Sequence, residues 1–152
     1  MGIQRMVLKE AFPEGYLAVT GLEKANRTGP IEAPLYELVK IRASQINGCA
    51  FCLNMHHRDA RKGGESQQRL DVLPAWREVE LFSDRERAAL ALTEAVTLIS
   101  EDGVPDEVWA EVRRNFDERE TAALIVAIAT INVWNRFAIS TRQQPEPAEI
   151  SA

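Results

Sequence analysis

The chain has 152 residues, the length of one domain with its own hydrophobic core. Its 18 Lys and Arg against 23 Asp and Glu give a net charge of −5, which argues against nucleic acid as a partner. Its two cysteines exclude a disulfide-stapled secreted scaffold and a four-cysteine zinc or iron–sulfur site.

Breaker and capping residues divide the chain into helical segments, and no stretch shows the sustained alternation of a strand. Ser83 with Glu86, and Asp117 with Glu120, are capping-box pairs that begin two of these segments. We therefore predict an all-α fold, a single domain over residues 1–152, and a disordered tail over 143–152. The predicted helices cover about residues 13–26, 34–47, 49–62, 65–72, 83–100, 105–115 and 117–142.

The last predicted helix is apolar on nearly all sides, since only Thr130 interrupts the run from Ala122 to Ile131. Such a helix is buried on several sides, either by the rest of the chain or by a neighbouring subunit. The run has about half the length of a membrane span, and the first residues lack the apolar run of a signal peptide. We expect a soluble, cytoplasmic protein with no membrane and no nucleic acid as a partner.

All cysteines and histidines of the chain lie between Cys49 and His57. At about 100° per residue, Cys49, Cys52 and His56 share an arc of about 60° on one helix, and His57 falls on another face. The two cysteines are close enough for a disulfide after a local adjustment. One turn later, His56 adds an acid/base group to the same face.

Glu37 is expected beside His56 if Asn47 and Gly48 form the turn of an antiparallel helix pair. At about 1.5 Å per residue, Glu37 lies roughly 15 Å before this turn and His56 roughly 12 Å after it. A carboxylate beside an imidazole orients the ring and raises its basicity. The pattern predicts a dithiol with an acid–base relay.

Three interpretations of the cysteine pair compete. A structural zinc site would have only three ligands, and these lack the usual intervening span. Two ordinary buried thiols also fit the spacing. A redox-active dithiol is favoured, because a helix N-terminus lowers the pKa of a thiol and makes the thiolate available near neutral pH. We expect neither a metal ion nor a bound cofactor.

The spacing Glu37-x11-Cys49-x2-Cys52-x3-His56 resembles the core motif of the AhpD-like alkylhydroperoxidases, within the carboxymuconolactone decarboxylase superfamily. The order of the surrounding helices is also similar, and the likeness covers roughly residues 15–141. It implies an AhpD-like helical fold with a CxxC-bearing helix and a long central apolar helix. It further implies a homo-oligomer, either a trimer or a hexamer built as a trimer of dimers.

The resemblance also implies a thiol-dependent peroxidase that reduces hydroperoxides. Cys52 would be the peroxidatic thiolate and Cys49 the resolving thiol, while Glu37 and His56 would take the proton from the dithiol. Peroxide would oxidise Cys52 to a sulfenic acid that condenses with Cys49 to a disulfide, and an external dithiol of lipoyl or thioredoxin type would reduce it. The family's best-known members carry a second histidine between the cysteines, where this chain has Phe51.

Two other functions fit the same residues: a dithiol–disulfide oxidoreductase that serves another protein, and a non-enzymatic redox-sensing oligomeric module. A lactone decarboxylase is least expected, because that reaction needs no dithiol. Other conspicuous residues have structural interpretations, with His57 exposed or locally bonded. The tryptophans are expected to anchor a core or an interface: Trp76, Trp109 and Trp134. The basic residues after His57 are expected to be solvated: Arg58, Arg61 and Lys62. The polar residues near the end of the last helix are expected to cap carbonyls or pair across subunits: Asn132, Asn135 and Arg136.

Overall fold

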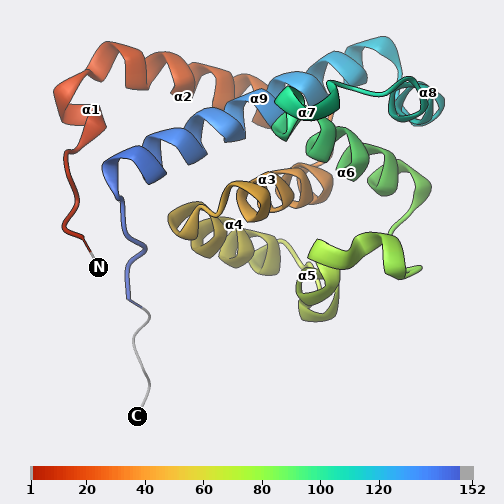
Figure 1. Cartoon of the computed structure of the whole chain (residues 1–152), viewed down its shortest axis with the longest axis horizontal. Coiled ribbons are helices and arrows are strands. Elements are labelled where there is room, and N and C mark those ends of the chain that lie inside the picture. The colour runs from red at the N-terminus through yellow and green to blue at the C-terminus, as the bar shows by residue number, and fades with distance from the viewer. Residues whose placement is uncertain (1, 148–152) are drawn as a thin grey trace.

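The computed structural model describes residues 2–147, which contain helices and no strand, so the prediction of an all-α fold is confirmed (Figure 1). Within the predicted disordered tail, residues 143–147 are not helical, and residues 148–152 lie outside the described part of the chain. The elements are α1 (Leu8–Ala11), α2 (Pro13–Arg27), α3 (Ala33–Asn47), α4 (Ala50–Lys62), α5 (Gln67–Val72), the 3-10 helix η1 (Leu73–Glu78), α6 (Asp84–Thr97), α7 (Ile99–Asp102), α8 (Asp106–Asn115) and α9 (Glu118–Thr141).

The long helix α9 is the centre of the fold and packs against α2, α3 and α6 (Figure 1). It begins at the predicted capping box, in which the Glu120 amide donates to Asp117 Oδ1 at 2.8 Å. Leu124 and Ile128 are completely buried. By length and composition alone α9 could cross a membrane. It contacts five other helices, α2, α3, α4, α6 and α8, as the core helix of a globular fold does.

The antiparallel helices α3 and α4 carry the cysteine–histidine segment, and the predicted turn at Asn47 and Gly48 joins them. Gly48 ends α3 with φ at 69°, a left-handed conformation that glycine adopts without a Cβ clash. Cys49 is the N-cap of α4, one residue before the helix, and its sulfur accepts a hydrogen bond from the Cys52 amide at 3.4 Å. The turn therefore places Cys49 at the N-terminus of α4.

Hydrogen bonds between side-chain amides connect this turn to α9. Asn47 Nδ2 donates to Asn132 Oδ1 and to Asn135 Oδ1, both at 2.9 Å. The completely buried Asn135 in turn donates to Ser44 Oγ at 3.0 Å. The predicted capping of carbonyls is confirmed for two residues, since Asn132 donates to the Ile128 carbonyl at 2.9 Å and Arg136 donates to the Asn132 carbonyl at 3.2 Å. The amide contacts of Asn132 and Asn135 with Asn47 stay within the chain. They fix the position of Cys49 relative to the central helix.

Some element boundaries differ from the predictions. The helix predicted over residues 65–72 begins two residues later, at Gln67, and ends at Val72 as predicted. The 3-10 helix η1 follows it directly, with Pro74 in its first turn, where the missing N–H is not needed. The helix predicted to reach residue 100 ends at Thr97, and the short α7 follows. Trp76 is buried as predicted, but Trp109 is 43% exposed, because the peripheral α8 buries only Val112.

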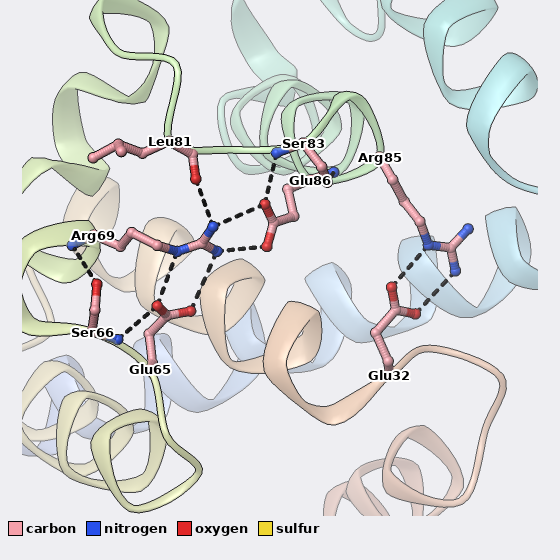
Figure 2. A network of polar contacts seen from close by, with 8 residues as sticks. All are labelled: Glu32, Glu65, Ser66, Arg69, Leu81, Ser83, Arg85 and Glu86. Atoms are coloured by element: carbon pink, nitrogen blue, oxygen red, sulfur yellow. Dashed lines mark hydrogen bonds and ion pairs between the residues drawn. The ribbon is translucent and has the colours of Figure 1, made fainter.

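Arg69 on α5 links this helix to the start of α6 (Figure 2). Its guanidinium donates to Glu65 at 2.9 Å, to the Leu81 carbonyl at 2.6 Å and to Glu86 at 2.5 Å. Glu86 also accepts a hydrogen bond from the Ser83 amide within the capping box. A single side chain therefore links the start of α5 to the segment before α6 and to α6 itself.

Replacing Arg69 with Met is expected to lower the free energy of unfolding by about 2 kcal/mol and the Tm by about 4–8 °C, since two partly buried carboxylates lose their partner. Thermal unfolding followed by circular dichroism measures this change. Arg114→Met is the matched control, because it removes the exposed pair with Glu111. A fall in Tm no larger than that of the control would contradict the role assigned to Arg69.

Candidate active site

Cys49 and Cys52 are joined in a disulfide at the N-terminus of α4, with a Cα–Cα distance of 5.4 Å. Both residues are only 1% exposed, and they pack against Ala138 of α9. The Cys52 amide is directed at the Cys49 sulfur, and a helix-terminal amide in this position favours negative charge on that sulfur. The predicted proximity of the two cysteines is confirmed, and the structure shows the pair in its oxidised form.

His56 lies one turn after Cys52, and the structure brings it together with Glu37 as the helix pair predicts. The ring is 3% exposed, and its Nδ1 lies 3.1 Å from Glu37 Oε2. Burial raises the pKa of the Glu37 carboxyl. The hydrogen bond from His56 and the positive charge of Lys40 outweigh burial and hold that pKa below its usual value.

The ionised Glu37 determines which ring nitrogen of His56 carries the proton. A carboxylate offers only acceptors, so Nδ1 must be the donor in this 3.1 Å contact. Nε2 is then the basic nitrogen of the neutral ring. His56 is therefore prepared to accept a proton at Nε2.

Lys40, which was not predicted as a site residue, completes the charge pattern around Glu37. Its Nζ lies 2.7 Å from Glu37 Oε1 and 3.7 Å from Glu23 Oε1, and it sits 3.9 Å above the Tyr36 ring. Lys40 is only 1% exposed. The available signal is the spacing, because Lys40 follows Glu37 by three residues and a helix places both side chains on one face.

A cavity of about 230 Å³ lies beside Cys52 and His56 and is bounded by α2, α4 and α9. Aromatic side chains form much of its wall, including Tyr16 and Trp134, whose rings meet edge to face at 5.1 Å. The other apolar lining residues are Leu8, Phe51, Met55, Phe137 and Ala138. Of the two cysteines, only Cys52 lines this cavity, which we call the thiol pocket.

Glu37 lines a different cavity, of about 170 Å³. Pro34, at the start of α3, and Asp59 and Gly63, near the end of α4, also contribute to its wall. Neither Cys52 nor His56 lines this second cavity. The Glu37–His56 pair therefore lies between two separate openings.

Residues that we predicted to lie outside the site have mixed outcomes. His57, expected to be exposed or locally bonded, is partly buried, and burial together with the charge of Arg61 lowers its pKa. Arg58 and Lys62 are exposed, as predicted. Trp134, expected as an anchor, instead lines the thiol pocket.

Comparison with known proteins places the chain among helical relatives. The sequence pattern of the carboxymuconolactone decarboxylase family matches residues 10–95. The chain is 45% identical over 137 residues to YdfG, an uncharacterised protein of Bacillus subtilis, covering 90% of this chain and 93% of YdfG.

Two crystal structures share the fold. One is a protein of unknown function from Agrobacterium tumefaciens, provisionally described as the antioxidant defence protein AhpD, with a TM-score of 0.92, 39% identity, and coverage of 95% of this chain and 99% of that chain. The other is the debrominase Bmp8 in its apo form, with a TM-score of 0.81, 22% identity, and coverage of 90% and 74%. At this identity the likeness to Bmp8 concerns the fold alone.

Proposed function

The chain belongs to the carboxymuconolactone decarboxylase family and has an AhpD-like fold, and from this premise we propose that it is a thiol-dependent peroxidase acting on organic hydroperoxides. One observation carries the proposal: Cys52 and His56 line one apolar pocket, while Cys49, which does not line it, forms a disulfide with Cys52. A thiol, a base and a resolving thiol are thus arranged around a space for a small substrate.

In the proposed first half-reaction, His56 Nε2 takes the proton from the reduced Cys52 thiol. The thiolate attacks one oxygen of the hydroperoxide, the O–O bond breaks, and the alkoxide leaves as an alcohol after taking a proton back from His56. Cys52 is oxidised by two electrons to a sulfenic acid, and the hydroperoxide is reduced by two electrons.

In the second half-reaction, the Cys49 thiolate attacks the sulfenic sulfur of Cys52. The S–O bond breaks, the oxygen leaves as water with one added proton, and the disulfide seen in the structure forms. An external dithiol then reduces the disulfide by thiol–disulfide exchange. The sum is hydroperoxide plus dithiol giving alcohol, water and the oxidised dithiol.

Burial of both sulfurs supports a small substrate over a protein disulfide. Each cysteine is 1% exposed, so a folded protein would have difficulty reaching the sulfurs, whereas a hydroperoxide or the slender arm of a lipoyl-type dithiol could enter the thiol pocket. We therefore place the dithiol–disulfide oxidoreductase function second. We also propose a cytoplasmic location, because the reaction needs a pool of reducing dithiol.

The thiol pocket supports a hydroperoxide with an apolar or aromatic group. Replacing Trp134 with Ala is expected to lower kcat/KM for cumene hydroperoxide by about tenfold, because the phenyl ring of the substrate loses its contact with the indole. Hydrogen peroxide, which has no apolar group, should lose less than about twofold. Trp109→Ala, on the exposed face of α8, is the matched control. Equal losses for both peroxides would contradict a substrate-binding role of Trp134.

A second copy of the chain is proposed as the physical partner. Apolar side chains on the outer faces of α2 and α9 are exposed, namely Leu17, Leu22, Ile125, Val126 and Ile139. Covering such side chains in a homo-oligomer would stabilise the assembly. A trimer or hexamer in sedimentation velocity would support this expectation, whereas a monomer at micromolar concentration would contradict it.

The experiment that tests the function is steady-state hydroperoxide reduction by wild-type protein with lipoyl-type and thioredoxin-type dithiols as donors. Many turnovers per protein with at least one donor are expected, together with a Cys49–Cys52 disulfide in peroxide-treated protein by mass spectrometry. Protein that keeps both thiols under excess hydroperoxide would overturn the proposal. Oxidation of one equivalent without turnover would favour a redox sensor.

A further inference from the structure

Lys40 is a buried cation with two carboxylates as its neighbours. It is 1% exposed, and its ammonium group lies 2.7 Å from Glu37 and 3.7 Å from Glu23. Taking an ammonium group out of water costs several kcal/mol, and a well-packed apolar residue would avoid this cost. Packing alone therefore does not account for a lysine at this position.

The two oxygens of Glu37 have different partners. Oε1 faces Lys40 Nζ, and Oε2 faces His56 Nδ1 at 3.1 Å. Lys40 thereby turns the second oxygen toward the ring and favours the ionised form of the carboxyl. Both effects act on the same outcome, which is a proton on Nδ1 and a free Nε2 in His56.

We propose that Lys40 is a positioning residue for His56: through Glu37, it keeps the ring proton on Nδ1 and leaves Nε2 unprotonated and available to the Cys52 thiol. This inference rests on the proposed function of His56 as the base of the dithiol. Glu23 weakens this influence of Lys40, because its carboxylate competes with Glu37 for the same ammonium group.

The charged groups around Glu37 come from four neighbouring segments. Glu23 on α2 is paired with Arg27 at 3.3 Å, and Asp59 on α4 and Glu65 after it share the second cavity with Glu37. Tyr36 supports Lys40 from the same helix. Among residues 2–147, Lys40 is the only Lys or Arg within 4.0 Å of a Glu37 oxygen, so no other such cation can replace it at that distance.

The test measures the rate at which iodoacetamide alkylates the reduced dithiol as a function of pH, with no peroxide present. In Lys40→Met, the Glu37–His56 pair is expected to take up a proton at a pH about one unit higher than in wild type, so the acidic loss of thiol reactivity moves up by about one unit. Lys40→Arg keeps the charge and is expected to restore most of the shift.

Glu23→Gln gives the opposite sign and keeps the test independent of whether Lys40→Met folds. Without the Glu23 carboxylate, the Lys40 ammonium group interacts with Glu37 alone. The fall in thiol reactivity at acidic pH, which is the acidic limb of the pH profile, is therefore expected to move to lower pH. An unchanged limb in both folded variants would overturn the proposal. A purely structural role of Lys40 predicts a lower Tm with the limb in place.

A double variant separates action through His56 from a direct effect of the ammonium charge on the thiols. In a His56→Gln background, Lys40→Met is expected to leave the limb unmoved, because the residue that transmits the effect is absent. A shift as large as in the wild-type background would overturn the positioning role. If the limb moves as expected but hydroperoxide turnover is absent, the peroxidase function fails and the role of Lys40 stands.

Discussion

Replacing Cys52 with Ser is expected to abolish hydroperoxide reduction, whereas replacing Cys49 with Ser is expected to leave a burst of about one hydroperoxide per protein. Cys52 is the cysteine that lines the thiol pocket, so its loss removes the group that meets the substrate. In Cys49→Ser, Cys52 is still oxidised to a sulfenic acid, but no second thiol resolves it. Turnover should then stop after the first event.

Rapid-mixing peroxide assays and mass spectrometry distinguish the two variants. Dimedone should label Cys52 in Cys49→Ser after peroxide treatment, and it should label nothing in Cys52→Ser. The variants must first give the helical circular dichroism of the reduced wild type. A burst in Cys52→Ser with none in Cys49→Ser would reverse the roles, as the amide directed at the Cys49 sulfur would permit.

Replacing Glu37 with Gln is expected to slow thiol activation by about 10²–10³-fold, although the change removes a single charge and keeps the shape. Lys40 is a donor only, so the Gln carbonyl oxygen will face it, in the position of Oε1. The Gln amide then faces His56 Nδ1 as a donor and places the ring proton on Nε2. Nε2, the nitrogen proposed to accept the thiol proton, would then already carry a proton.

Nitrogen NMR of the histidine rings reports the tautomer directly, and alkylation rates report its effect on the thiols. His57→Gln is the matched control, because this ring lies on another face of α4, and it should change neither the His56 tautomer nor the rate. A Glu37→Gln variant that keeps Nδ1 protonated yet loses reactivity would contradict the tautomer mechanism.

Unfolding experiments on Glu37→Gln add a pH dependence with a defined sign. The folded-state pKa of Glu37 is held below its ordinary value of 4.5, so ionisation stabilises the fold above that pH. This contribution is lost as the pH falls through the folded-state pKa. The free energy of unfolding of Glu37→Gln should therefore be lower than that of wild type at pH 7, and the difference should narrow below pH 4.5. A constant difference would contradict the shift.

Local signals allowed most of the fold to be predicted. Capping boxes at Ser83 and Asp117 mark where α6 and α9 begin, because they satisfy amides that the first helical turn leaves free. Gly48 marks the end of α3, because glycine readily adopts the left-handed conformation in which this helix ends. The four-residue α1 was missed, since so short a helix carries no periodicity.

The site could be predicted only where its geometry depends on one helix pair. Glu37 and His56 lie at similar distances from the same turn, so residue counting brings them together. Glu23 reaches Lys40 from α2, and the thiol pocket combines Tyr16 with Trp134, which are far apart in the sequence. Such contacts depend on how α2 packs against α9, which no local pattern specifies.

In the proposed reaction, the second cavity would give substrate and protons separate entrances. A hydroperoxide that fills the 230 Å³ pocket displaces water from the side of Cys52 and His56. Glu37, which does not line that pocket, keeps its own opening of 170 Å³. Proton exchange between the buried pair and the surrounding buffer therefore does not have to wait for the product to depart.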